Sequence, residues 1–147
     1  MQLTEDGKVF TQIVLEIFKL SGLIAADGDR LTKDLGLTSA RWKVLGALSM
    51  AGEPMTVAKI AKTMGQTRQG VQRIADEMAD AGIVTYRNNP NHKRAKFMVL
   101  TDKGNEVYKK LIKIQYPWAE EKAEGIELKE MQMTLRVLKM LTQKFEN

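Results

Sequence analysis

The chain has 147 residues, 44% of them hydrophobic and 28% charged, which is the balance of one ordinary globular domain. It contains no cysteine, and this excludes disulfides, zinc–thiolate sites and thiol redox sensing. Lys and Arg number 23 against 18 Asp and Glu, a mild basic excess that suggests a polyanionic partner only if it is concentrated on one surface. We expect a soluble cytoplasmic protein without a membrane segment. The first residues do not resemble a signal peptide, and no apolar run approaches the roughly 18–20 residues of a membrane span.

The first predicted element is an amphipathic helix over residues 4–26, because apolar side chains recur there at three- and four-residue spacing. Two interpretations of its wide apolar surface remain open: one broad core face, or a core face and a second face for a partner subunit. The main apolar stripe of this helix consists of Phe10, Ile13, Val14, Ile17, Leu20, Ser21 and Ile24, and the residues that widen it are Val9, Leu15, Phe18 and Leu23. A connection containing Gly28, Asp29 and Gly36 is expected to follow the helix.

Three threonines then mark the starts of three successive helices. Thr38 precedes a helix that includes residues 41–48, and Thr56 precedes a second helix that Gly65 can end in a left-handed conformation. Thr67 follows after one residue and begins a third helix. A helix, a glycine-containing turn and a second helix form the helix-turn-helix pattern.

The third helix separates apolar and polar side chains. Val71, Ile74, Ala75 and Met78 fall on one face. The opposite face carries long donors near the start of the helix, of the kind that bind guanine O6 and N7 through Arg or adenine N6 and N7 through Gln. Acidic residues follow only in the half that would leave a DNA groove. The predicted DNA-contacting residues of this helix are Thr67, Arg68, Gln69, Gln72 and Arg73.

Gly70 is unusual inside this helix, since a mid-helix glycine costs about 1 kcal/mol relative to alanine. It indicates either close approach of a sugar-phosphate strand or of the preceding helix, or simple tolerance of glycine.

A basic hairpin is predicted next. Residues 83–87 and 96–100 resemble strands, and a segment rich in turn formers and positive charge joins them. Between residues 56 and 104 nine Lys and Arg residues oppose four acids, so the whole net charge of +5 falls in this third of the chain. The predicted DNA contacts of this wing are Asn91, His92, Lys93, Arg94 and Lys96.

Two helices are expected to complete the chain. Thr101 caps the first, over residues 102–115, and Pro117 is expected to end it. The second spans residues 127–145 and has more apolar surface than one face uses. Burial of the terminal helices against a second copy of the chain would account for this surface.

The segments at residues 36–48 (GLTSARWKVLGAL), 55–84 and 89–104 (NPNHKRAKFMVLTDKG) resemble the MarR family of bacterial and archaeal transcription regulators. The resemblance implies a single domain over residues 1–147 that is mainly α with a small β-hairpin wing. In it, a winged helix-turn-helix at 38–104 is flanked by dimerisation helices at 1–30 and 102–147. It also implies a homodimer on a pseudo-palindromic double-stranded DNA operator, with recognition helices in major grooves and wing tips in minor grooves. A small aromatic or anionic effector is possible, and no cofactor is expected.

The wing departs from the family pattern at one position. The family usually carries an acid two places before the arginine that enters the minor groove, whereas this chain has His92 before Arg94. Such a wing would be looser, or would bind DNA in a pH-dependent way. Alternatively, His92 is a solvated loop residue.

The sequence leaves three classes of function open. The first is a sequence-specific repressor released from DNA by a small ligand, and the second is a winged helix that binds an acidic protein without a ligand response. An enzyme is the weakest candidate, because one histidine and no cysteine leave few candidate nucleophiles or bases.

Overall fold

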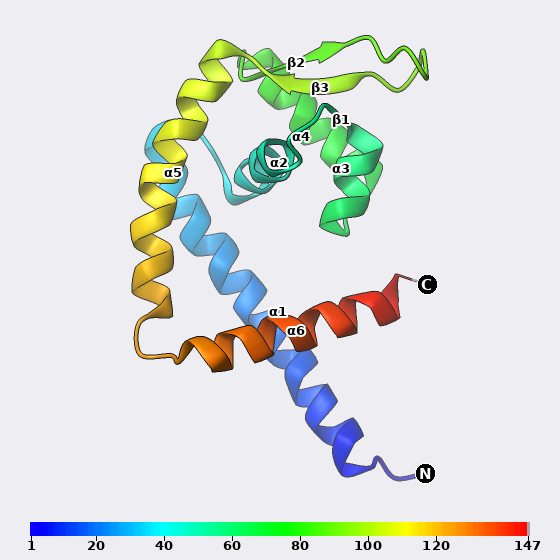
Figure 1. Ribbon diagram of the computed structural model, residues 1–147, viewed down its shortest axis with the longest axis vertical. Helices are drawn as coiled ribbons and strands as arrows, with labels where there is room; N and C mark the ends of the chain where they lie inside the picture. Colours follow the sequence, from blue (N-terminus) through cyan, green and yellow to red (C-terminus); the bar gives the residue numbers. More distant parts are fainter. Residues whose placement is uncertain (147) are drawn as a thin grey trace. The chain divides into compact units, whose positions relative to one another are not determined.

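The computed structural model describes residues 1–146 and forms two compact units, Met1–Ile112 and a second that begins at Lys113. The predicted fold class is confirmed, since the chain is mainly α with a small three-stranded antiparallel sheet (Figure 1). The elements in order are α1 (Glu5–Thr32), the 3-10 helix η1 (Lys33–Leu35), α2 (Ser39–Met50), β1 (Met55–Thr56), α3 (Val57–Met64), α4 (Arg68–Asp80), β2 (Val84–Arg87), β3 (Phe97–Leu100), α5 (Asp102–Ala123) and α6 (Leu128–Phe145).

Helix α1 begins where the sequence predicts but continues beyond the predicted end at residue 26. Thr4 caps it by accepting a hydrogen bond from the Gly7 amide. Its last turns persist through Gly28 because they pack against the start of α2. The Asp29 carboxylate accepts the Ser39 backbone N–H at 2.6 Å. A Cβ at Gly28 would come within 3.0 Å of the Ser39 hydroxyl oxygen, so glycine permits this close approach.

The apolar content of α1 corrects one expectation from the sequence. The segment Glu5–Leu35 contains an 18-residue window with a mean hydropathy of 1.6, so by length and composition it could cross a membrane. Counting consecutive apolar residues missed this, because isolated polar residues interrupt the run without lowering its average much. Core helices of soluble proteins and signal sequences share the property, so it is weak evidence for a membrane span.

The helix-turn-helix is built as predicted. Thr38, Thr56 and Thr67 each accept a hydrogen bond from the backbone N–H three residues later, and these bonds satisfy donors that have no partner inside a helix. Gly65 ends α3 with a φ of 64°, in the left-handed region. The buried faces of α2, α3 and α4 share one hydrophobic core with the sheet. The fully buried residues of this core include Val44, Leu45, Ile60, Val71, Met78 and Met98.

The sheet has the order β1-β3-β2, and its two longer strands form the predicted hairpin. Val84 pairs with Leu100, and Arg87 pairs with Phe97. The two-residue strand β1 was not predicted, and it pairs Thr56 with Phe97 on the other edge of β3. This pairing ties the start of α3 to the base of the wing.

Helix α5 does not end at Pro117, as the sequence predicted, but runs through it to Ala123. Proline removes one backbone hydrogen bond from a helix interior, yet the bonds on either side can continue the helix at that local cost. Thr101 caps α5 as predicted, since its hydroxyl accepts the Gly104 N–H at 3.0 Å.

Both terminal helices expose large apolar side chains. On α1, Leu15 is 62% exposed and Phe18 is 69% exposed. Helix α6 begins within one residue of its predicted start and has no buried residue. The buried residues of α1 are Gly28 and Thr32, both near its end, and this argues against a single broad core face along the helix.

Candidate nucleic-acid interface

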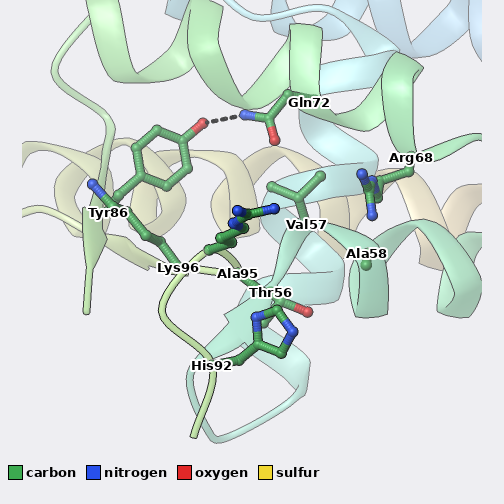
Figure 2. Close-up of a pocket in the computed structure, with 10 residues that line it drawn as sticks. Thr56, Val57, Ala58, Arg68, Gln72, Tyr86, His92, Ala95 and Lys96 are labelled. Carbon is green, nitrogen blue, oxygen red and sulfur yellow. Dashed lines mark hydrogen bonds between the residues drawn. The ribbon is translucent and has the colours of Figure 1, made fainter. Parts of the chain in front are cut away.

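All ten residues predicted to contact DNA are exposed. Five of them converge on one cleft of about 440 Å³, formed by the start of α3, the first turns of α4 and the wing (Figure 2). Helix α4 contributes Arg68 and Gln72. The wing contributes His92, Arg94 and Lys96. Residues far apart in the sequence thus present three permanent positive charges to one space.

Three residues at the start of α3 also line this cleft, together with Tyr86 and Ala95, and the sequence did not predict them as part of the site. They are Thr56, Val57 and Ala58. The N-terminus of a helix carries unpaired N–H groups and a partial positive charge, which favour a nearby anion. Strand β1 brings them to the wing, and a strand of two residues leaves no recognisable pattern in a sequence.

The remaining predicted residues of α4 lie on a second, more open depression. Gln69 and Arg73 line it together with Arg68 and Gln72, and so do the acidic side chains Asp76, Glu77 and Asp80. The exposed face of α4 therefore changes from basic to acidic along its length, in the direction predicted from the sequence. Thr67 stands at the start, where its hydroxyl caps the helix.

Gly70 does not approach the preceding helix. A Cβ at this position would meet only the capping hydroxyl oxygen of Thr67, at 3.0 Å. That contact is tight, so glycine suits the cap of α4. The predicted close approach of Gly70 to the preceding helix, α3, is therefore wrong. Its close approach to a sugar-phosphate strand stays a prediction.

The wing tip is folded by its own turn. The Asn89 side chain accepts the Asn91 backbone N–H at 3.0 Å, and the Asn89 carbonyl accepts the His92 N–H at 3.1 Å. Asn91 and Lys93 line neither cleft and remain exposed at this turn. Within residues 1–146 no ion pair restrains Arg94, consistent with the absence of the usual wing acid.

A hydrogen-bonded triangle connects α4 to strand β2 of the wing, and the sequence did not reveal it. The Tyr86 hydroxyl on β2 donates to Asp76 Oδ1 at 2.7 Å. Gln72 Nε2 donates to the same carboxylate oxygen at 2.9 Å and to the Tyr86 hydroxyl oxygen at 3.0 Å. Tyr86 was predicted only as a strand residue, and its role depends on how β2 lies against α4.

The pKa of Tyr86 is raised well above its ordinary value. Partial burial is the largest cause, because it disfavours the charged phenolate. The hydrogen bond to Asp76 and the charge of that carboxylate act in the same direction, whereas the hydrogen bond from Gln72 opposes them. The hydroxyl therefore stays protonated, and remains a donor, at pH values where a free tyrosine ionises.

This raised pKa predicts how stability depends on alkaline pH. Because the folded pKa exceeds the unfolded value of about 10, the stabilising contribution of Tyr86 is complete below that pH and is lost as pH rises further. We expect the free energy of unfolding to fall more steeply above about pH 10 in the wild type than in Tyr86→Phe. Urea unfolding across that range measures both slopes, and equal slopes would contradict the assignment.

In the described part of the chain, no group of three or more His, Asp or Glu side chains is placed to hold a metal ion. The site consists instead of a capped helix with long exposed donors at its start, a left-handed turn before it and a basic hairpin beside it. These features define a winged helix-turn-helix protein.

Comparison with known proteins agrees with this class. The sequence model of the MarR family matches residues 35–95. The chain is 36% identical over 96 residues to the uncharacterized protein Rv2011c of Mycobacterium tuberculosis, and the aligned part covers 65% of this chain and 66% of that protein. A crystal structure of the MarR family transcription regulator SP03579 superposes with a TM-score of 0.78 at 25% identity, covering 95% of this chain and 92% of the other. The chain belongs to the MarR family of transcription regulators.

A further similar structure is that of CouR from Rhodococcus jostii RHA1, which was solved bound to p-coumaroyl-CoA. The TM-score is 0.78 at 19% identity, and the match covers 88% of this chain and 90% of CouR. At this identity the likeness concerns the fold alone.

Proposed function

We propose that the protein is a sequence-specific transcription regulator that binds double-stranded DNA through α4 and the wing. The convergence of Arg68 and Gln72 with Arg94 and Lys96 on one cleft is the observation that carries this proposal. Guanidinium and amide groups can bind base edges in the major groove, whereas the basic wing suits the phosphate backbone or the minor groove.

The start of α3 supports the same assignment. Thr56, Val57 and Ala58 line the cleft beside three basic side chains, and the first N–H groups of a helix have no partner within it, so a phosphate group of the DNA backbone is the anion expected there. Contacts to phosphate fix the position of a protein on the duplex, so this part of the cleft would set the depth at which α4 enters the groove.

We further propose that the working form is a homodimer assembled from residues 1–30 and 102–147. The support is the large exposed apolar surface of α1 and of α6, which a second copy would remove from water. Such a dimer would act in the cytoplasm on a pseudo-palindromic operator as a repressor.

The proposal also includes regulation by a small-molecule effector. CouR, which shares the fold, binds an aromatic, anionic acyl-CoA. By analogy, this regulator would leave DNA when a small aromatic or anionic ligand binds.

Selection of bound duplexes from a random pool tests the proposal. We expect a two-fold symmetric site whose half-site centres lie one helical turn apart, about 10–10.5 base pairs, and whose affinity falls steeply with salt. The proposal fails if no duplex is enriched above the non-specific level. A nuclease-resistant complex with an acidic protein would then identify the basic face as a protein-binding surface.

A further inference from the structure

The side-chain amide of Gln72 is restrained from one side only. Its nitrogen has two acceptors, Asp76 Oδ1 at 2.9 Å and the Tyr86 hydroxyl oxygen at 3.0 Å. Within residues 1–146 no donor is bonded to its carbonyl oxygen. A side chain proposed to read DNA thus has its donor half engaged by the protein itself.

The positions of the protons are fixed by the chemistry of the three groups. An ionised carboxylate only accepts hydrogen bonds, so the amide atom beside Asp76 must be the nitrogen. Tyr86 has one hydroxyl proton, which goes to Asp76 at 2.7 Å, and its oxygen is left to accept from Gln72. Each donor then has one acceptor, and reversing the amide would place two acceptors in contact. The raised pKa of Tyr86 maintains this pattern, because the hydroxyl keeps its proton.

The amide oxygen consequently lies on the open side. Figure 2 shows the Gln72 oxygen directed into the cleft, away from the bonded nitrogen. We propose that Tyr86 and Asp76 act as positioning residues that make Gln72 present only an acceptor to the DNA, so that it selects an amino group in the major groove.

This arrangement predicts a particular kind of base preference. A free glutamine amide can bind adenine with both halves, accepting from N6 and donating to N7, and it thereby distinguishes adenine from cytosine. An amide that offers only its oxygen can accept from adenine N6 or cytosine N4 alike. It is repelled by the acceptors of guanine and thymine, O6 and O4. The contacted strand should therefore tolerate A or C and reject G or T.

The inference rests on the proposed DNA binding, and its test begins with a selected operator duplex. Gln72→Ala identifies the contacted base pair as the one at which preference is relaxed. Four duplexes that differ only at that pair are then titrated with the wild type. We expect the A and C duplexes to bind within about threefold of one another and the G and T duplexes to bind at least fivefold more weakly.

The decisive variant is Tyr86→Phe, which keeps the aromatic ring and removes the hydroxyl. One amide N–H of Gln72 then loses its acceptor and becomes available to adenine N7. We expect this variant to favour A over C by about fivefold or more. Replacement of the contacted adenine by 7-deazaadenine, which lacks N7, should weaken binding by Tyr86→Phe and leave the wild type within twofold.

Tyr108→Phe is the matched control. Tyr108 is also half-buried against the core but lies on α5, outside the triangle. The base preference of Tyr108→Phe should therefore equal that of the wild type. Thermal unfolding of both variants verifies that they are folded, and circular dichroism can confirm their helix content.

Several results would overturn the inference while leaving the proposed function intact. They are a specific operator at which Gln72→Ala relaxes no base pair, a wild type that prefers A over C, and a wild type weakened by 7-deazaadenine. An unchanged preference in Tyr86→Phe would overturn it as well. If no duplex is bound specifically, the proposed function itself fails, and the two failures are thereby distinguishable.

Discussion

Replacement of Gly104 by alanine is expected to lower the free energy of unfolding by about 3 kcal/mol. Gly104 is buried in the first turn of α5, and an added Cβ would collide with the backbone carbonyl of Ile83. That carbonyl cannot rotate away, because it accepts the backbone N–H of Thr101 at 3.1 Å and also the Thr101 hydroxyl. Relief of the collision would require α5 to separate from the residue that directly precedes β2. Urea unfolding of the purified variant measures the loss.

Gly46→Ala is the control for this prediction. Gly46 lies inside α2 with a negative φ, and a Cβ there would meet no atom within 4 Å apart from its chain neighbours and the nearby backbone of its own helix. Alanine is the better helix former, so we expect no loss of stability and a gain of up to about 1 kcal/mol. A Gly104→Ala protein as stable as Gly46→Ala would show that the junction between β2 and α5 is not closely packed.

Arg94→Ala is expected to weaken binding to every duplex by roughly tenfold, because a contact to the backbone or minor groove adds affinity with little sequence preference. Arg94 is exposed on the wing and lines the cleft shared with α4, with no ion pair to hold it elsewhere in the described part of the chain. The slope of log affinity against log salt should fall in magnitude by about 1. Gel shifts of selected and random duplexes over a salt series provide the measurement.

Lys33→Ala removes a positive charge of similar exposure from η1, outside both clefts, and serves as the matched control. It should leave the affinity within about twofold and the salt slope unchanged. If Arg94→Ala behaves like Lys33→Ala, the wing does not contact DNA. If it alters the preference at one base pair only, the wing reads sequence and does not merely position the protein.

The elements that could be predicted from the sequence are those defined by local chemistry. Thr38, Thr56 and Thr67 cap helices because a hydroxyl oxygen can reach the amide three residues later whatever surrounds it. Gly65 ends α3 because only glycine adopts a positive φ without cost. The same local rules predicted too early an end for α1 and a break at Pro117. In α1 the contact of Asp29 with Ser39 extends the helix, and in α5 the helix continues across the proline.

The candidate site, too, could be predicted from the sequence only in part. The type and spacing of Arg68, Gln72 and Arg94 were enough to predict that they face a common partner, and they do line one cleft. The sequence could not show that Gln72 is already bonded through its nitrogen, since Tyr86 lies fourteen residues further along the chain. It also missed the start of α3 as part of the cleft, because the pairing of β1 with β3 is a long-range contact.

The sequence by itself therefore determined which segments are helices, where most of them begin, and that the positive charge belongs to one third of the chain. These properties depend on neighbours within a few residues and on composition. Only the tertiary structure decided which atoms of the exposed face are free to bind. Hydrogen-bond partners on separate elements, such as α4 and β2, meet only after the core has packed.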